Sequence, residues 1–400
     1  MTRQVQDAYI VAATRSPIGR APRGALRHYR PDDLLAHVIR ALLAQVPSLD
    51  PAAIEDAIVG CAMPEGSQGL NVARLGVLLA GLPASVGGVT VNRFCASGLT
   101  AIAMAADRIR VGEADVIIAA GTESMSQNPP MGANPSFSPQ IYAHDENLGI
   151  AFGMGLTAEK VAERWQVSRE DQDAFALQSH QRAIAAQDAG EFADEITPVD
   201  ITEKTAGLGG GGLRVQQRTL SLDEGPRRDT SLEALARLKP VFAARGSVTA
   251  GNSSQTSDGA GALLVVSERA LKAHNLTPLA RFASFAVRGV PPEIMGIGPK
   301  EAVPAALKLA GLAQDQLDWI ELNEAFAAQS LAVIRELDLD PARVNPLGGA
   351  IALGHPLGAS GAVLMTRMIH HMRANGIRYG LQTMCEGGGT ANATVVELVA

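Results

Sequence analysis

Cysteine and aromatic residues are scarce in this sequence. It holds 3 cysteines among 400 residues, and aromatic side chains make up 4%. An odd, scattered set of cysteines does not form a disulfide framework, which indicates a reducing compartment, with the cytoplasm as the expected location. No apolar run reaches the roughly 18 residues that a membrane helix needs, and no apolar signal core follows Met1. We therefore expect no contact with a membrane.

Positive charge is also in short supply. Lysine and arginine number 34 against 41 aspartate and glutamate residues, which gives a net charge of −7. This balance argues against nucleic acid as a partner. An anionic ligand would need a local basic site or a helix N-terminus. The sequence also lacks HExxH, paired CxxC spacing and a nucleotide-binding fingerprint, so we expect no metal site.

Small and aliphatic residues are abundant instead. Hydrophobic residues make up 46% of the chain, and 41 residues are glycine. Short apolar runs alternate with helical patterns, which is typical of a layered α/β protein with a parallel or mixed sheet. The predicted strands are Ala8–Ala13, Ala57–Cys61, Val116–Ala120, Ala262–Ser267, Trp319–Leu322, Gly380–Cys385 and Ala393–Leu398. The predicted helices are Pro31–Gln45, Gly98–Val111, Arg169–Ala189, Pro304–Ala310 and Gly358–Ala374.

An internal repeat divides the chain. Val-Asn at 91–92 leads to Cys-Ala-Ser-Gly at 95–98 and then to a helix and a strand. Val-Asn at 344–345 leads to Gly-Ala-Ser-Gly at 358–361 and the same succession. Chance similarity of two strand-loop-helix units is the alternative. We predict two halves, 1–120 with 247–275 and 276–400, and a loop domain at 121–246 inserted in the first. The glycine run 207–212 is interpreted as a flexible tip of this insertion.

Cys95 is the best candidate nucleophile. Small residues and an apolar helix follow it directly, so its thiol is expected at a helix N-terminus. There the helix dipole and free N–H groups would lower the pKa of the thiol and could hold an oxyanion. The alternative is a buried structural cysteine.

His355 is the best candidate base. Glycines precede it and Pro356 follows it, so the sequence predicts a loop that displays the imidazole at a helix start. A purely structural histidine is the alternative.

Two further residues stand at predicted strand ends. Cys385 precedes the glycines 387–389, whose N–H groups could form an oxyanion nest, although Cys385 could equally be a small residue in a tight turn. Asn323 follows a strand and could hold a water or a carbonyl, or cap the next helix. Cys61 lacks such a context and is interpreted as structural.

Taken together, these loops resemble those of the thiolases. The matching stretches are 92–99, 249–261, 323–327, 348–361 and 384–389, and the resemblance extends over essentially the whole chain. It implies a five-layered α-β-α-β-α fold built from two repeated halves with an inserted loop domain. It also implies a homodimer or homotetramer, and no tightly bound cofactor, with coenzyme A and acyl-CoA as substrates.

The resemblance also implies roles for individual residues. Cys95 would accept the acyl group, His355 would activate it, and Cys385 would move a proton to or from the substrate α-carbon. Asn323 would hold a water that forms an oxyanion hole with His355, and the N–H groups of Cys95 and Gly387 would form another. The predicted CoA and acyl contacts are Ser254, Arg227, Arg228 and Met154.

Two departures bear on the substrate. The stretch 151–159 lacks the histidine common in acetoacetyl-CoA-forming members, and Glu386 stands where isoleucine or valine is common. The stretch 252–259, in turn, looks closer to the degradative branch of the family. We therefore expect a degradative thiolase that cleaves 3-ketoacyl-CoA to acetyl-CoA and a shortened acyl-CoA, as in β-oxidation. A dedicated acetoacetyl-CoA thiolase and a non-catalytic acyl-CoA-binding scaffold are the alternatives, and a ketoacyl synthase is disfavoured because Cys385 stands where a second histidine is typical.

Overall fold

The sheet runs continuously through both halves of the chain. The computed structural model describes residues 5–206 and 212–399. Among these, ten strands form one mixed sheet in the order β10-β11-β12-β9-β1-β8-β5-β3-β4, with β2 on β8. The strands are β1 (Ala8–Arg15), β2 (Gly19–Arg20), β3 (Asp56–Gly60), β4 (Val89–Val91), β5 (Val116–Ser124), β8 (Ser257–Ser267), β9 (Ala280–Gly289), β10 (Trp319–Leu322), β11 (Tyr379–Glu386) and β12 (Thr390–Leu398). The halves meet where β1 pairs with β9, over only Tyr9–Arg281 and Ile10–Ala280.

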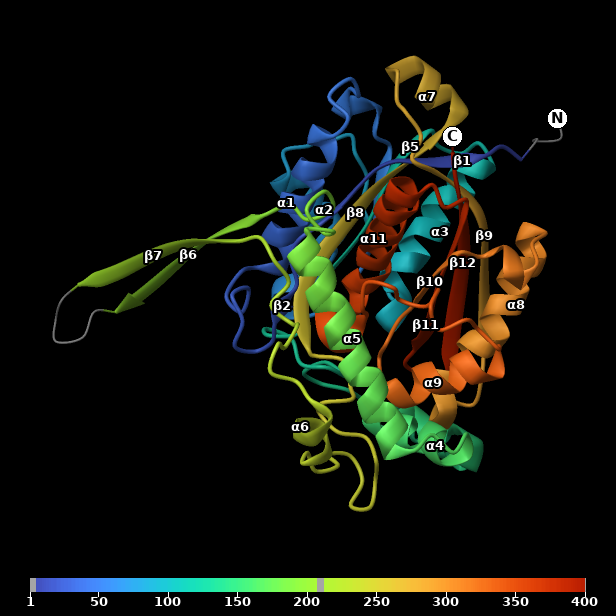
Figure 1. The fold of residues 1–400 in the computed structure, drawn as a ribbon. Coiled ribbons are helices and arrows are strands. Elements are labelled where there is room, and N and C mark those ends of the chain that lie inside the picture. Colours follow the sequence, from blue (N-terminus) through green and yellow to red (C-terminus); the bar gives the residue numbers. More distant parts are fainter. Residues whose placement is uncertain (1–4, 207–211, 400) are drawn as a thin grey trace.

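Helices cover this sheet in three layers (Figure 1). The middle layer is α3 (Ser97–Arg110), which contacts strands of the first half, and α11 (Ser360–Asn375), which contacts strands of both halves. One outer layer is α1 (Pro31–Ala44) and α2 (Val72–Leu79); the other is α8 (Pro299–Ala310) and α9 (Ala327–Glu336). Three apolar clusters fill the spaces between these layers. The two halves of the sheet thus form two β layers between the three helix layers, and the predicted five-layered α-β-α-β-α fold is confirmed.

The two middle helices begin in the same way, as the sequence repeat predicts. A 3₁₀ turn, η3 (Phe94–Ala96), leads into α3, and a second, η9 (Leu357–Ala359), leads into α11. The helices cross where Gly98 faces Gly361, and a Cβ on Gly361 would collide with the backbone of Leu99. Glycine is thus required for the close approach of the two helix starts, which brings both predicted catalytic loops to one place.

Several elements were not predicted. Strand β9 was missed because its residues alternate between buried and half-buried positions and include Arg281, Ser284 and Arg288, so no apolar run marks it. The helices α2, α4 (Met154–Arg164) and α9 were also missed, as was the short helix α7 (Glu268–His274).

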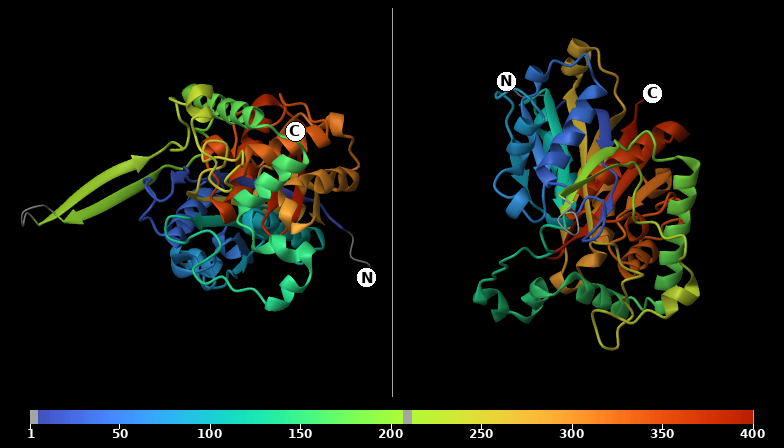
Figure 2. Two further views of the ribbon diagram at one scale, coloured as in Figure 1. Left: turned by 90° about the horizontal axis from the view of Figure 1, so that it is seen from below. Right: turned by 90° about the vertical axis from the view of Figure 1, so that its left-hand side faces the viewer.

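The insertion leaves the first half after β5 and returns before β8, two strands that pair with each other. It contains α4, α5 (Arg169–Ala189) and α6 (Leu232–Ala236), and α4 and α5 contact α9 of the second half. A hairpin of β6 (Val199–Ala206) and β7 (Leu213–Leu220) projects away from the body (Figure 2). The glycine run falls largely outside the described residues, and the predicted domain limits stay predictions. Within the described ranges, no helix combines the length and apolarity required to cross a membrane.

Candidate active site

Cys95 lies in the turn η3, between β4 and α3, and its side chain is buried. Side chains hold this turn: Asn92 Oδ1 accepts from the Phe94 N–H at 2.8 Å, and Ser97 Oγ accepts from the Arg93 N–H at 2.8 Å. Phe94 has a φ of 45°, a left-handed conformation that those bonds stabilise. The sequence therefore places the thiol at the start of the middle helix α3, as predicted.

The thiol of Cys95 is protonated in the resting protein. Burial, and secondarily the charge of Glu386, raises the pKa of Cys95 to about 12, against the opposing N–H groups of Gly387 and of Cys95 itself. The sequence interpretation expected a lowered pKa. The N–H groups do act in that direction, but desolvation outweighs them, so Cys95 needs a base.

His355 lies in the loop between α10 (Ala350–Leu353) and η9. It is buried, with 3% exposure, rather than displayed as expected. Its backbone N–H donates to Ser257 Oγ at 3.0 Å, and its Nδ1 lies 2.6 Å from Ser360 Oγ, which donates to Pro356 O at 2.9 Å. Because that hydroxyl proton is engaged, Nδ1–H donates to Ser360 and Nε2 carries the lone pair that can accept a proton. Burial lowers the pKa of His355 to about 4, so a neutral imidazole is ready to accept a proton.

Asn323 lies directly after β10, with its Nδ2 3.3 Å from His355 Nε2. Its Oδ1 is buried and has no partner among the described residues, so it is an acceptor available to a ligand. The predicted alternative of a helix cap is wrong, because α9 begins later and Phe326 is its N-cap residue.

The backbone around Asn323 is fixed by neighbouring polar side chains. Asn345 donates to Leu322 O at 2.7 Å and accepts from the Leu322 N–H at 2.9 Å. Glu324 accepts from Asn345 Nδ2 at 3.0 Å and from Ser179 Oγ of α5 at 2.6 Å. Glu324 was not predicted as a site residue, although an acid directly after Asn323 at the end of a buried strand was a signal for it.

Cys385 and the glycine turn close the site on the side of β11. Cys385 is 1% exposed; burial raises the pKa of its thiol, and a thiolate on Cys95 would raise it further. The strand β11 that carries Cys385 contacts η3, the turn that carries Cys95. Gly388 and Gly389 both have a φ of +87°, which glycine adopts without strain. A Cβ on Gly387 would lie 3.5 Å from the Phe94 ring and 3.6 Å from Met154 Sδ. The structure thus brings Cys95, Cys385, Gly387 and Met154 together.

Glu123 is a second residue that the sequence interpretation missed. Its buried carboxyl group accepts from the backbone N–H groups of Ala62 at 2.7 Å, Met63 at 3.3 Å and Gly358 at 2.8 Å, and from the side chain of Gln68. It thereby ties the end of β3 to the loop that follows His355. An acidic residue at the end of the apolar strand β5 was the signal.

The predicted substrate contacts lie near the His355 loop. Gln255, the neighbour of Ser254, donates to Gly225 O at 3.0 Å and to Ala352 O at 2.9 Å, which holds the segment before Arg227 against this loop. Arg228 is exposed and donates to Asp188 Oδ2 at 2.9 Å. The guanidinium group of Arg227 has no hydrogen-bond or ion-pair partner in the described part of the chain, although its backbone N–H donates to His180 Nδ1 at 3.1 Å.

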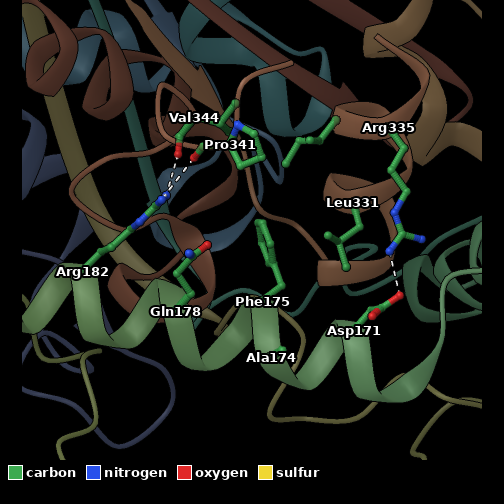
Figure 3. Close-up of a pocket in the computed structure, with 10 residues that line it drawn as sticks. Asp171, Ala174, Phe175, Gln178, Arg182, Leu331, Arg335, Pro341 and Val344 are labelled. Carbon is green, nitrogen blue, oxygen red and sulfur yellow. Dashed lines mark hydrogen bonds and ion pairs between the residues drawn. The ribbon is translucent and has the colours of Figure 1, made fainter. Parts of the chain in front are cut away.

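A surface pocket of about 270 Å³ lies between α5 and α9 (Figure 3). None of the predicted site residues lines it. At one end Arg182 donates to Val344 O at 2.8 Å and Pro341 O at 3.1 Å, and at the other Arg335 pairs with Asp171. These contacts attach α5 to α9 and to the loop that ends at Asn345. The residues around this pocket therefore stabilise the site and take no part in the reaction.

Comparison with known families identifies the fold. The family model for the thiolase N-terminal domain matches residues 8–269, and the model for the thiolase C-terminal domain matches residues 276–398. The chain belongs to the thiolase family. Thiolases are acyltransferases, so the predicted enzyme class is confirmed.

Individual thiolases are similar over their full length. The chain is 49% identical to a 3-ketoacyl-CoA thiolase of Bacillus subtilis, over 98% of this chain and 100% of that protein. It is 48% identical to a β-ketoadipyl-CoA thiolase of Pseudomonas aeruginosa, over the same shares. Among solved structures, human mitochondrial 3-ketoacyl-CoA thiolase in complex with CoA matches with a TM-score of 0.87 at 38% identity, covering 100% of both chains.

Proposed function

We propose that this chain catalyses CoA-dependent thiolysis of 3-ketoacyl-CoA, through an acyl group carried on Cys95. The observation that supports it most is that the fold gathers two buried thiols and a buried imidazole whose Nδ1–H donates to Ser360, which leaves Nε2 as the proton acceptor. The turn η3 that carries Cys95 packs against η9, which begins two residues after His355.

The first half-reaction follows from these groups. His355 Nε2 takes the proton of Cys95 as the sulfur attacks the 3-keto carbon, so that free thiolate need not accumulate. The bond between carbons 2 and 3 breaks, which leaves the acyl group on Cys95 and the enolate of acetyl-CoA. Protonated His355 and a water held at Asn323 stabilise the enolate oxygen, and Cys385 donates its proton to the carbon.

The second half-reaction restores the site. The thiolate of Cys385 takes the proton of an incoming CoA thiol, whose sulfur attacks the thioester on Cys95. The N–H groups of Cys95 and Gly387 stabilise the oxyanion. Cys95 leaves and recovers its proton from His355, and the shortened acyl-CoA departs. Transfer between thiols is nearly isoenergetic, which suits a cysteine nucleophile.

Acylation of Cys95 tests this proposal. Acetyl-CoA alone should add one acetyl group to the peptide that contains Cys95, as detected by mass spectrometry of the digested protein. An acetyl group on Cys385 or Cys61 instead would overturn the assignment of roles.

The 3-ketoacyl chain of the substrate is proposed to be unbranched, aliphatic and longer than four carbons. The space beside Gly387 and Gly388 is bordered by Phe94, Met154 and Ile150, all apolar. Met154, the acyl contact predicted from the sequence, lies beside the glycine turn.

The names of similar proteins raise a second candidate, a 3-ketoacyl chain that ends in a carboxylate. The two differ in charge at equal length, so 3-ketohexanoyl-CoA and 3-ketoadipyl-CoA form a matched pair. We expect faster thiolysis of the former, because the buried acid Glu386 lies next to the glycine turn. Faster thiolysis of 3-ketoadipyl-CoA would instead support the second candidate.

CoA recognition is assigned to Ser254 and the Arg227 segment. Gln255, next to Ser254, bonds Gly225 and Ala352, which supports placing Ser254 and the segment after Gly225 at one site, and the guanidinium group of Arg227 is available to a phosphate. No tightly bound cofactor is proposed.

A homo-oligomer is proposed to form through the sheet edge at β4. This strand ends the sheet, and exposed apolar side chains lie on it, just before α2, and on α2, η3 and α3. They are Leu70, Leu75, Leu78, Leu79, Val89, Phe94 and Met104. An open edge beside an apolar patch fits a second copy across a twofold axis. Light scattering should give a multiple of the chain mass, lowered by Val89→Lys; a wild-type monomer would overturn the proposal.

A further inference from the structure

Glu386, at the end of β11, is a buried acid with few partners. Its Oε2 accepts one hydrogen bond, from Thr390 Oγ1 at 2.7 Å, and Oε1 has no partner among the described residues. The nearest cation is Arg93, whose Nε lies 4.0 Å from Oε2 and whose Nη1 is itself buried without a partner. A fully ionised buried carboxylate normally accepts several hydrogen bonds.

Glu386 and Arg93 each lie next to a segment that carries a reactive sulfur. Glu386 directly follows Cys385 on β11, and Arg93 precedes Cys95 by two residues, just before η3. Because η3 packs against β11, a charge on Glu386 acts on the site from within the protein, where water screens it poorly.

We propose that Glu386 is a positioning residue that acts on Cys95 through its charge: the neutral carboxyl group lets Cys95 release its proton, and the carboxylate opposes that release. This inference rests on the proposed function, in which Cys95 must lose its proton to react. Arg93 and Thr390 set the proportion of neutral to ionised Glu386, since each stabilises the carboxylate.

The charges around the site agree with this assignment. Burial raises the pKa of Glu386 to about 7, while Thr390 and Arg93 act in the opposite direction. The charge of Glu386 is the main contribution after burial to the raised pKa of Cys95, and it acts in the same direction on Cys385. Glu123 of β5 also faces Cys95, with a smaller effect.

The test is the rate at which iodoacetamide alkylates Cys95, followed on its own peptide from about pH 5.5 to about pH 9. Glu386→Gln keeps the shape of the side chain and removes the charge. At low pH its rate should match that of the wild type, and above about pH 8 it should be roughly tenfold faster, the effect of one unit in the pKa of Cys95. Equal rates for Glu386→Gln and wild type at every pH would overturn the proposal.

Further variants separate charge from structure. Thr390→Val and Arg93→Met each remove one stabiliser of the carboxylate, so the pKa of Glu386 should rise. The change of slope that Glu386 causes in the pH profile of the alkylation rate should therefore persist but move to higher pH. Glu397→Gln removes a negative charge at the opposite end of the β11–β12 pair and should leave the profile unchanged. If this change of slope stays at the wild-type pH in both Thr390→Val and Arg93→Met, the assigned roles of Arg93 and Thr390 are contradicted.

The same measurements keep the two proposals apart. Alkylation requires only a reactive Cys95, whereas the proposed function requires acetylation by acetyl-CoA. If acetyl-CoA acetylates Cys95 of the wild type, but Glu386→Gln and wild type have the same pH profile of alkylation, the inference alone is refuted. A profile that responds to Glu386→Gln in a protein that acetyl-CoA never acylates refutes thiolysis alone.

Discussion

Ser360→Ala should slow acylation of Cys95 while leaving substrate binding almost unchanged. The Ser360 hydroxyl is buried, and it is the acceptor for Nδ1–H of His355. Without it, the imidazole with its lone pair on Nε2 keeps an unpaired buried Nδ1–H. The other tautomer puts the proton on Nε2, where it can no longer accept one from Cys95.

The magnitude follows from that one contact. An unsatisfied buried donor costs about 1 to 2 kcal/mol, so the reactive tautomer should become about five- to thirtyfold rarer and acylation slower by the same factor. The hydrogen bond from Asn323 to Nε2 still favours the reactive tautomer, which limits the loss. KM should change little, because Ser360 is proposed to act only through the imidazole.

Rapid-quench measurement of acetyl incorporation into the Cys95 peptide gives the acylation rate directly. Ser360→Thr retains the hydroxyl group and is the matched control, expected closer to wild type. Thermal unfolding of each variant separates a loss of folded protein from a loss of rate. An acylation rate in folded Ser360→Ala equal to that of wild type would refute the argument that this hydroxyl selects the tautomer.

Three more predictions follow from the site. Cys385→Ala should still be acetylated on Cys95 but should lose exchange of the acetyl α-protons with deuterated solvent, measured by NMR; wild-type exchange would remove Cys385 from the carbon-acid role. Arg227→Ala should raise KM for CoA more than Arg228→Ala does, because Arg228 is engaged with Asp188; the difference should shrink with added salt, and equal KM values for both variants at low salt would place the phosphates elsewhere. In the spectrophotometric thiolysis assay, kcat/KM should rise from acetoacetyl-CoA to 3-ketohexanoyl-CoA and 3-ketooctanoyl-CoA, since each buried methylene contributes about 0.8 kcal/mol; a steep fall would indicate a dedicated acetoacetyl-CoA thiolase.

Much of the fold could be predicted because its central strands are continuous apolar runs. The runs at β5 and β8 are buried over their whole length and stand out without further context. Strand β9 alternates between buried and half-buried positions and includes arginine and serine, so local composition did not distinguish it from a loop.

The catalytic loops could also be located from the sequence, but their electrostatics could not. Cys95 and His355 stand among small residues and glycines, and that context is visible in the chain. How deeply each is buried depends on the packing of α3 against α11, so the pKa of Cys95 was expected to fall and is instead raised. The burial of Glu386 also depends on packing, so the sequence showed Glu386 only as an unusual neighbour of Cys385.

The attachment of α5 has a consequence for engineering this enzyme. Ser179 holds Glu324 and accepts from the Gly349 N–H at 3.1 Å, while Arg182 binds the carbonyl of Val344. The insertion therefore carries both Met154, the proposed acyl contact on α4, and the α5 side chains that hold the catalytic loops, so acyl specificity and catalytic geometry are not separable modules. A chimera that exchanges the insertion for that of another thiolase would lose turnover along with its old chain-length preference, unless both side chains are grafted back.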